Sequence, residues 1–184
     1  MRSIISMGFM LLVGLVPFNH LNASEVAVAR SAVVEKSVPA ILDILRDHTN
    51  TCHSGCLYKM TNLEESQVID VNEIEEIVWQ RISGIRETRQ FVKSSLSKEG
   101  DVFVWFSRYP EQSELDNLQI ETGLDHVSTF RVMQIKWQLK PISESQTEVS
   151  VEMKVDHTLS AVGDPIIRNS INKTLLTLFY NFSI

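Results

Sequence analysis

Apolar side chains recur every three or four residues over residues 164–184. The stripe is formed by Ile167, Ile171, Leu175, Leu178 and Phe182, and it is widened by Ile166, Leu176 and Phe179. This spacing predicts an amphipathic α-helix with a broad apolar face. Asp164 suits the N-cap, and Pro165 suits the first turn, where no backbone N–H is needed. Because so apolar a face is unfavourable in water, we expect the helix to pack on the rest of the chain.

Alternating apolar and polar positions predict strands over most of the preceding chain. A strand is predicted at residues 26–34, followed by a short helix at 37–46 with Ser37 as its N-cap. Further strands are predicted at residues 56–71 (one kinked strand or two), 74–82, 89–98, 102–107, 127–139 and 149–155. The strand at 102–107 is apolar on both faces, so it should be central. Residues 109–125 are predicted to form a long acidic loop.

This order of elements lacks the alternation of strand and helix that a parallel sheet requires. We therefore predict an α+β protein, in which a curved antiparallel sheet wraps around the long C-terminal helix and short helices follow the first strand. The space between the sheet and the last helix is where we expect the functional site.

The N-terminus has the features of an export signal. Arg2 precedes an uncharged apolar run at residues 4–18, and the small residue Ala23 follows. This pattern predicts a signal peptide at residues 1–23 and a ligand-binding domain at residues 24–184, with the protein periplasmic or secreted. The run is shorter than the roughly 20 apolar residues of a spanning helix, although a retained short anchor is the alternative.

The net charge of −6 and the lack of a Lys/Arg block argue against a nucleic-acid partner. The same acidic balance disfavours electrostatic docking on anionic lipid, but it leaves transient apolar contact with a membrane open.

Cys52 and Cys56 are the two cysteines of the chain. They lie close to Asp47, His48 and His53, so a zinc site is one interpretation. A structural zinc site commonly draws its four ligands from two pairs, however, and no second cysteine pair exists. An exported protein meets an oxidising environment, which favours a local Cys52–Cys56 disulfide. We expect no metal and no cofactor.

Four stretches resemble the START domain of the START-like (helix-grip, SRPBCC) superfamily. Residues 32–47 give a strand, a proline-containing turn and a helix that ends in Leu-Arg-Asp. Residues 84–92 look like the family's proline-rich turn followed by Arg-Asp-Phe-Val, although the prolines are missing and Gln90 stands in place of Asp. Residues 137–149 and 163–167 look like the family's last hairpin and the Gly-x-Pro entry to its final helix. The resemblance covers nearly all of the predicted mature chain.

The resemblance implies a helix-grip fold with an apolar tunnel that binds a lipid, a sterol or another hydrophobic small molecule. It also implies that Arg89 lies inside the tunnel and meets the polar head of the ligand. A buried guanidinium needs a partner, so pairing with Glu75 or Glu76, or exposure to solvent, is the alternative. Residues 109–125 correspond to a loop near the tunnel mouth. Its predicted gating residues are Tyr109, Leu115, Leu118, Ile120 and Leu124.

Large adaptable side chains on the predicted strands and on the last helix are candidates for ligand contact. They are Trp79, Trp105, Met133, Trp137, Met153, Leu175, Phe179 and Phe182. The alternative for each is an ordinary core position.

Three functions remain open at this point. The first is an exported protein that binds a lipid, with lipid transfer as its role. The second is a cyclase or hydrolase on the same fold that uses His126, His157 or Arg89, although the sequence has no recognisable catalytic motif and we assign no catalytic residue. The third is a protein-interaction domain that holds no ligand.

Overall fold

The computed structural model describes residues 24–47, 63–83, 87–157 and 163–182. Within these ranges, seven strands form one antiparallel sheet in the order β1-β7-β6-β5-β4-β3-β2. The strands are β1 (Ser24–Val34), β2 (Leu63–Val71), β3 (Glu75–Ile82), β4 (Thr88–Glu99), β5 (Val102–Arg108), β6 (Phe130–Pro141) and β7 (Thr147–His157). The helices are α1 (Val38–Arg46), α3 (Gln112–Thr122) and α4 (Asp164–Phe182). The predicted α+β class is confirmed.

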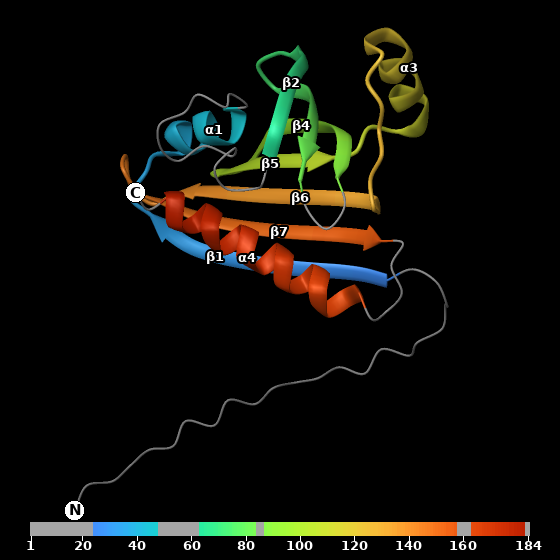
Figure 1. Cartoon of the computed structure of the whole chain (residues 1–184). Coiled ribbons are helices and arrows are strands. Elements are labelled where there is room, and N and C mark those ends of the chain that lie inside the picture. The colour runs from blue at the N-terminus through green and yellow to red at the C-terminus, as the bar shows by residue number, and fades with distance from the viewer. Residues whose placement is uncertain (1–23, 48–62, 84–86, 158–162, 183–184) are drawn as a thin grey trace, which may run out of the picture.

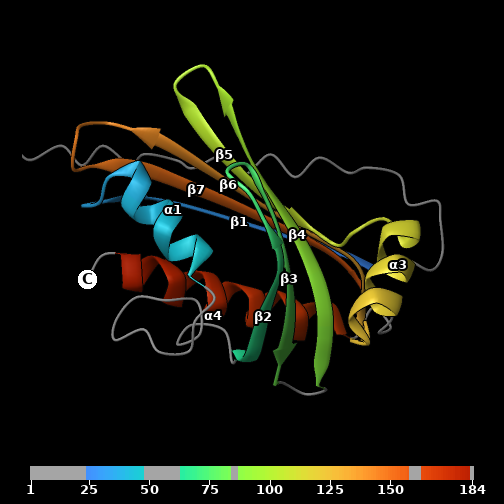
Figure 2. The ribbon, with the colours of Figure 1, turned by 90° about the horizontal axis from the view of Figure 1, so that it is seen from above.

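The sheet curves, and the last helix lies along β1 and β7 on one side of it (Figure 1). Two side-chain bonds attach the helix to β1: Arg30 donates to Asn172 Oδ1 at 2.9 Å, and Arg168 donates to the Ala27 carbonyl at 2.9 Å. Helix α1 packs on the same side, whereas α3 lies on the other side of β3 and β4 (Figure 2). We call the side toward α1 and α4 the inner face of the sheet, and the opposite side the outer face.

The apolar stripe of α4 is the core contact of that helix. Ile167, Ile171, Leu175, Phe179 and Phe182 are buried against the inner face. The ring of Phe182 meets the ring of Trp137 edge to face, with centroids 5.6 Å apart. Ile166 and Leu176, which were expected to widen the stripe, are instead exposed.

Local sequence signals explain the shorter elements. The Ser37 side chain accepts a bond from the Ala40 backbone N–H at 3.4 Å and so caps α1 as predicted. At the β2–β3 turn, Asn72 Oδ1 accepts from the N–H groups of Ile74 and Glu75. Gly100 takes a φ of +65° in the β4–β5 turn, a conformation that glycine adopts without steric cost.

Strand β5 is the middle strand of the sheet, as its two apolar faces predicted. Val104 is buried on one face, and Trp105 is buried on the other. No helix within the ranges described combines the length and apolarity needed to cross a bilayer.

The prediction of a loop at residues 109–125 is wrong, because α3 occupies most of it. Its acidic sequence carries only a weak helical pattern, and just two of its residues, Leu115 and Leu118, are buried. The signal for the helix lies at its end. Gly123 has a φ of +71° and donates its N–H to the Gln119 carbonyl at 3.0 Å, which is a typical helix C-terminus.

Candidate functional site

The inner face of the sheet is largely apolar and aromatic. Most of the side chains predicted to contact a ligand meet here: Trp105, Met133, Trp137 and Met153 on the face itself, and Leu175, Phe179 and Phe182 from α4, which packs against it. The structure therefore brings these residues together in one core cluster. Direct contact between any of them and a ligand stays a prediction.

A row of polar side chains interrupts this face. The register places Glu76 of β3 beside Ser94 of β4, and Ser94 beside Ser107 of β5. The two serine hydroxyls are hydrogen-bonded at 2.9 Å. The exposed fractions of Glu76, Ser94 and Ser107 are only 3%, 4% and 7%. We call these three residues the polar row. Burying such groups is unfavourable unless they find partners, so their presence on a core face requires an explanation.

Beyond the polar row, the same line of paired residues is apolar on the remaining strands. Ser107 is paired with Ile135 of β6, Ile135 with Met153 of β7, and Met153 with Val28 of β1. One line across the inner face is thus polar over β3 to β5 and apolar over β6, β7 and β1. An elongated molecule with one polar end would match this division.

A second polar cluster lies where β5 ends. The hydroxyl of Tyr109 donates to Gln90 Oε1 at 2.9 Å and shares a 2.8 Å bond with Ser128 Oγ. Burial raises the pKa of Tyr109 to about 12, while the bond with Ser128 opposes the shift. Gln90, which stands where the resembled family has Asp, therefore has an uncharged partner in this protein.

His126 lies beside the start of β4. Its Nδ1 accepts a hydrogen bond from the backbone N–H of Phe91 at 3.1 Å, and its ring meets Tyr109 edge to face at 4.8 Å. Burial lowers the pKa of His126, and the nearby Asp125 carboxylate acts in the opposite direction. An Nδ1 that accepts a bond carries no proton, so this geometry requires a neutral imidazole.

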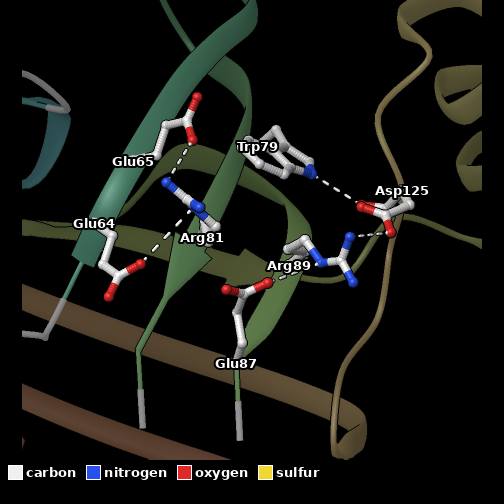
Figure 3. A network of polar contacts seen from close by, with 7 residues as sticks. All are labelled: Glu64, Glu65, Trp79, Arg81, Glu87, Arg89 and Asp125. Carbon is white, nitrogen blue, oxygen red and sulfur yellow. Dashed lines mark hydrogen bonds and ion pairs between the residues drawn. The ribbon is translucent and has the colours of Figure 1, made fainter.

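Arg89 lies on the outer face, which corrects the expectation that it enters the tunnel. Its Nη1 is 2.6 Å from Asp125 Oδ2, and its Nε is 3.3 Å from Glu87 Oε1 (Figure 3). Successive residues of a strand point to opposite faces. Arg89 therefore shares a face with Phe91, which packs under α3, whereas Gln90 points inward. The expected alternative partners, Glu75 and Glu76, are not the ones that Arg89 uses.

The same alternation places Trp79 on the outer face. It packs with Ile77, Phe91, Leu115 and Leu118, and its Nε1 donates to the Asp125 carbonyl at 2.9 Å (Figure 3). Trp79 therefore holds the segment after α3 and does not line the inner face.

The predicted gating loop is wrong, because most of its residues do not face the space between the sheet and α4. Leu115, Leu118 and Leu124 belong to the outer-face core, and Ile120 is 81% exposed on α3. Among the five predicted gating residues, Tyr109 alone packs against the inner-face core.

The second candidate catalytic histidine, His157, lies at the end of β7. It is buried, and its Nε2 is 2.9 Å from Oδ1 of Asp164, the first residue of α4. The start of α4 therefore lies beside the end of β7. Residues 52 and 56, the predicted disulfide pair, lie outside the part of the chain that the structure describes. Within that part, no three His, Cys, Asp or Glu side chains gather in a way that could hold a metal ion.

Sequence reasoning missed Glu76, Gln90, Ser94 and Ser107. A signal exists in β4, where Gln90 and Ser94 alternate with the inward-facing Val92 and Leu96. It becomes readable only after the inner face of the strand is known.

The sequence matches no model of a known protein family and no curated protein at a significant level. Solved structures, by contrast, are similar over most of the chain. A STAR-related lipid transfer protein from Xanthomonas axonopodis has a TM-score of 0.64 at 13% identity, covering 85% of each chain. Human StAR-related lipid transfer protein 5 has a TM-score of 0.61 at 8% identity, covering 85% of this chain and 73% of the other. The Zhui aromatase/cyclase from a Streptomyces species has a TM-score of 0.59 at 8% identity, covering 86% and 92%.

Proposed function

Because this chain has the START-like, helix-grip fold, we propose that it binds a lipid or another apolar small molecule between the inner face and α4, with lipid transfer as its role. The observation that carries the proposal is the composition of the inner face. It joins aromatic and methionine side chains to a buried polar row along one line of the sheet. Similarity to two structures named as lipid transfer proteins supports the same function.

The inner face has the chemistry to hold an apolar molecule. Burying apolar surface stabilises a complex by roughly 25 cal/mol per Å². The flat rings of Trp105 and Trp137 and the flexible side chains of Met133 and Met153 suit an irregular hydrocarbon, because they can adjust to its shape. The polar end of such a ligand would then meet the polar row.

The test is native mass spectrometry with lipid extraction on protein purified from the compartment in which it accumulates. We expect a co-purifying apolar molecule at a stoichiometry near one. A protein that carries no such molecule, and that also fails to take up a fluorescent acyl chain or sterol, would contradict the proposal.

A matched pair of variants locates the site. Met153→Lys places a charge on the inner face and should abolish uptake of the fluorescent acyl chain. Glu152→Lys introduces the same residue at the neighbouring position of β7, which points to the other face, and should leave uptake intact. Equal uptake by both variants would place the ligand elsewhere.

We also propose that residues 1–23 direct export to the periplasm or beyond. Cleavage after Ala23 would keep all of the described strand β1 (Ser24–Val34) on the mature chain. N-terminal sequencing of the exported protein should therefore begin at Ser24. Protein that stays in the cytoplasm with an intact N-terminus would contradict this proposal.

A further inference from the structure

The serine pair of the polar row retains one hydrogen-bond donor. Each serine hydroxyl carries one hydrogen and two lone pairs. The bond between Ser94 and Ser107 uses one of the two hydrogens, and neither hydroxyl has another partner among the residues that the structure describes. Both side chains are more than nine-tenths buried, so bulk water is not a ready acceptor for the remaining hydrogen. A buried donor left unpaired costs about 1–3 kcal/mol, so an acceptor from a ligand would be favoured here.

Glu76 provides the complementary group. Glu76 is paired with Ser94 in the register, so the two side chains leave the sheet on the same side. A carboxylate can accept about four hydrogen bonds. Glu76 can therefore accept a bond from a ligand in addition to the partner that it already has. The polar row thus presents one spare donor beside one acceptor.

The polar row contains one acidic side chain and no basic one. Along the register from Glu76 through Ser94, Ser107 and Ile135 to Met153, no position is Lys or Arg. At the neighbouring Trp105, Arg46 reaches the inner face. Its guanidinium lies 5.0 Å from the centre of the Trp105 ring and donates to the Glu73 carbonyl at 2.7 Å. A ligand phosphate or carboxylate at the polar row would share the face with Glu76, and the row itself offers it no Lys or Arg.

We propose that the polar row recognises the hydroxyl group of an uncharged, alcohol-bearing lipid. The hydroxyl oxygen accepts the spare hydrogen of the Ser94–Ser107 pair, and the hydroxyl hydrogen is donated to Glu76. The hydrocarbon part extends along Ile135, Met153 and the aromatic residues of the inner face. A carbonyl can satisfy only the donor, and an ammonium can satisfy only the acceptor, so a hydroxyl fits both groups. This inference rests on the proposed ligand site between the sheet and α4.

A competition between three lipids with similar hydrocarbon chains tests the proposal. The full chain is incubated with an equimolar mixture of oleyl alcohol, oleate and octadecene supplied from cyclodextrin, and the bound molecules are extracted and quantified. We expect oleyl alcohol to be enriched about five- to tenfold over each of the others, the effect of one or two hydrogen bonds. Binding of oleate or octadecene as strong as that of oleyl alcohol would overturn the inference.

Variants assign the preference to the polar row. Ser94→Ala with Ser107→Ala should remove the enrichment of oleyl alcohol over octadecene while total binding persists. Ser95→Ala, on the same strand but the opposite face, is the control and should keep the enrichment. Glu76→Gln should reduce the discrimination against oleate. An equal loss of enrichment in the Ser95→Ala protein would also overturn the inference.

The outcomes separate the two proposals. Binding of all three lipids without preference would leave the apolar site in place and remove the hydroxyl recognition. Binding of none of them by the wild-type protein would remove both. The wild-type preference is measured without any variant, so a variant that fails to fold does not prevent a decision.

Discussion

Tyr109 shows how one buried hydroxyl group connects distant parts of the chain. It follows β5, bonds to Gln90 on β4, and pairs with Ser128 just before β6. Gln90 is itself buried, so its side-chain oxygen depends on this donor. The phenol thus joins the start of β4 to the two ends of the segment that contains α3.

We expect Tyr109→Phe to destabilise the protein by about 1–3 kcal/mol, because Gln90 Oε1 loses its donor in a buried place. The free energy of unfolding in urea measures this loss. Ser128→Ala leaves that donor in place and should cost less. The wild-type absorbance titration should contain a tyrosine component with a pKa of about 12 that is absent from the Tyr109→Phe protein. A titration unchanged by the substitution would contradict the assignment.

His126 makes stability depend on pH. Its folded-state pKa is lowered by burial, whereas an unfolded histidine titrates at about 6.5. Below that pH the unfolded chain binds the proton more readily, so the contribution of His126 is complete above about pH 6.5 and is lost as the pH falls. Protonation would also remove the acceptor of the Phe91 N–H. Unfolding measured over this range should show a shallower pH dependence in a His126→Gln variant, and equal slopes would exclude the role.

Helix α4 is held by its buried stripe. Phe182 is fully buried and lies against Trp137, and both rings belong to the inner-face core. The polar contacts of the helix, from Arg30 to Asn172 and from Arg168 to the Ala27 carbonyl, fix its position along β1. The stripe provides most of the stabilisation, since these polar contacts are few.

We expect Phe182→Ala to destabilise the protein by about 3–5 kcal/mol, the range for large buried aromatic residues. Leu176→Ala on the same helix removes an exposed side chain and should change stability by less than about 0.5 kcal/mol. Urea unfolding of the two variants provides the comparison. Similar losses in both would show that the buried stripe is not what holds the helix.

The whole molecule has apolar cores on both faces of one sheet. The larger joins the inner face to α1 and α4, and the smaller joins the outer face to α3. A ligand between the sheet and α4 would add to the larger core. Such a ligand binds only the folded chain, so it should raise the free energy of unfolding by about 2.7 kcal/mol at a concentration 100 times its Kd.

Thermal unfolding with and without oleyl alcohol measures this coupling. We expect the melting temperature to rise with ligand concentration in the wild-type protein and to stay unchanged in the Met153→Lys variant. A rise of equal size in both proteins would indicate binding away from the inner face.

Most elements could be predicted because periodicity is local information. The four-residue spacing from Ile167 to Ile171 to Leu175 predicts a helix wherever it packs, and the alternation in Val149, Val151 and Val155 predicts a strand with one buried face. Helix α3 escaped prediction because only its two leucines face a core, and its remaining residues resemble those of an acidic loop.

The sequence by itself thus determined the α+β class, the order of the strands with α1 and α4, and the stripe by which α4 packs. The face to which each residue points relative to α4, and its neighbours across the sheet, required the folded chain. Arg89 and Gln90 are adjacent in sequence and differ in face alone, yet one pairs with Asp125 outside and the other bonds to Tyr109 inside. Glu76, Ser94 and Ser107 form a row only through strand pairing. Strand pairing joins residues far apart in the chain, so no local pattern records it.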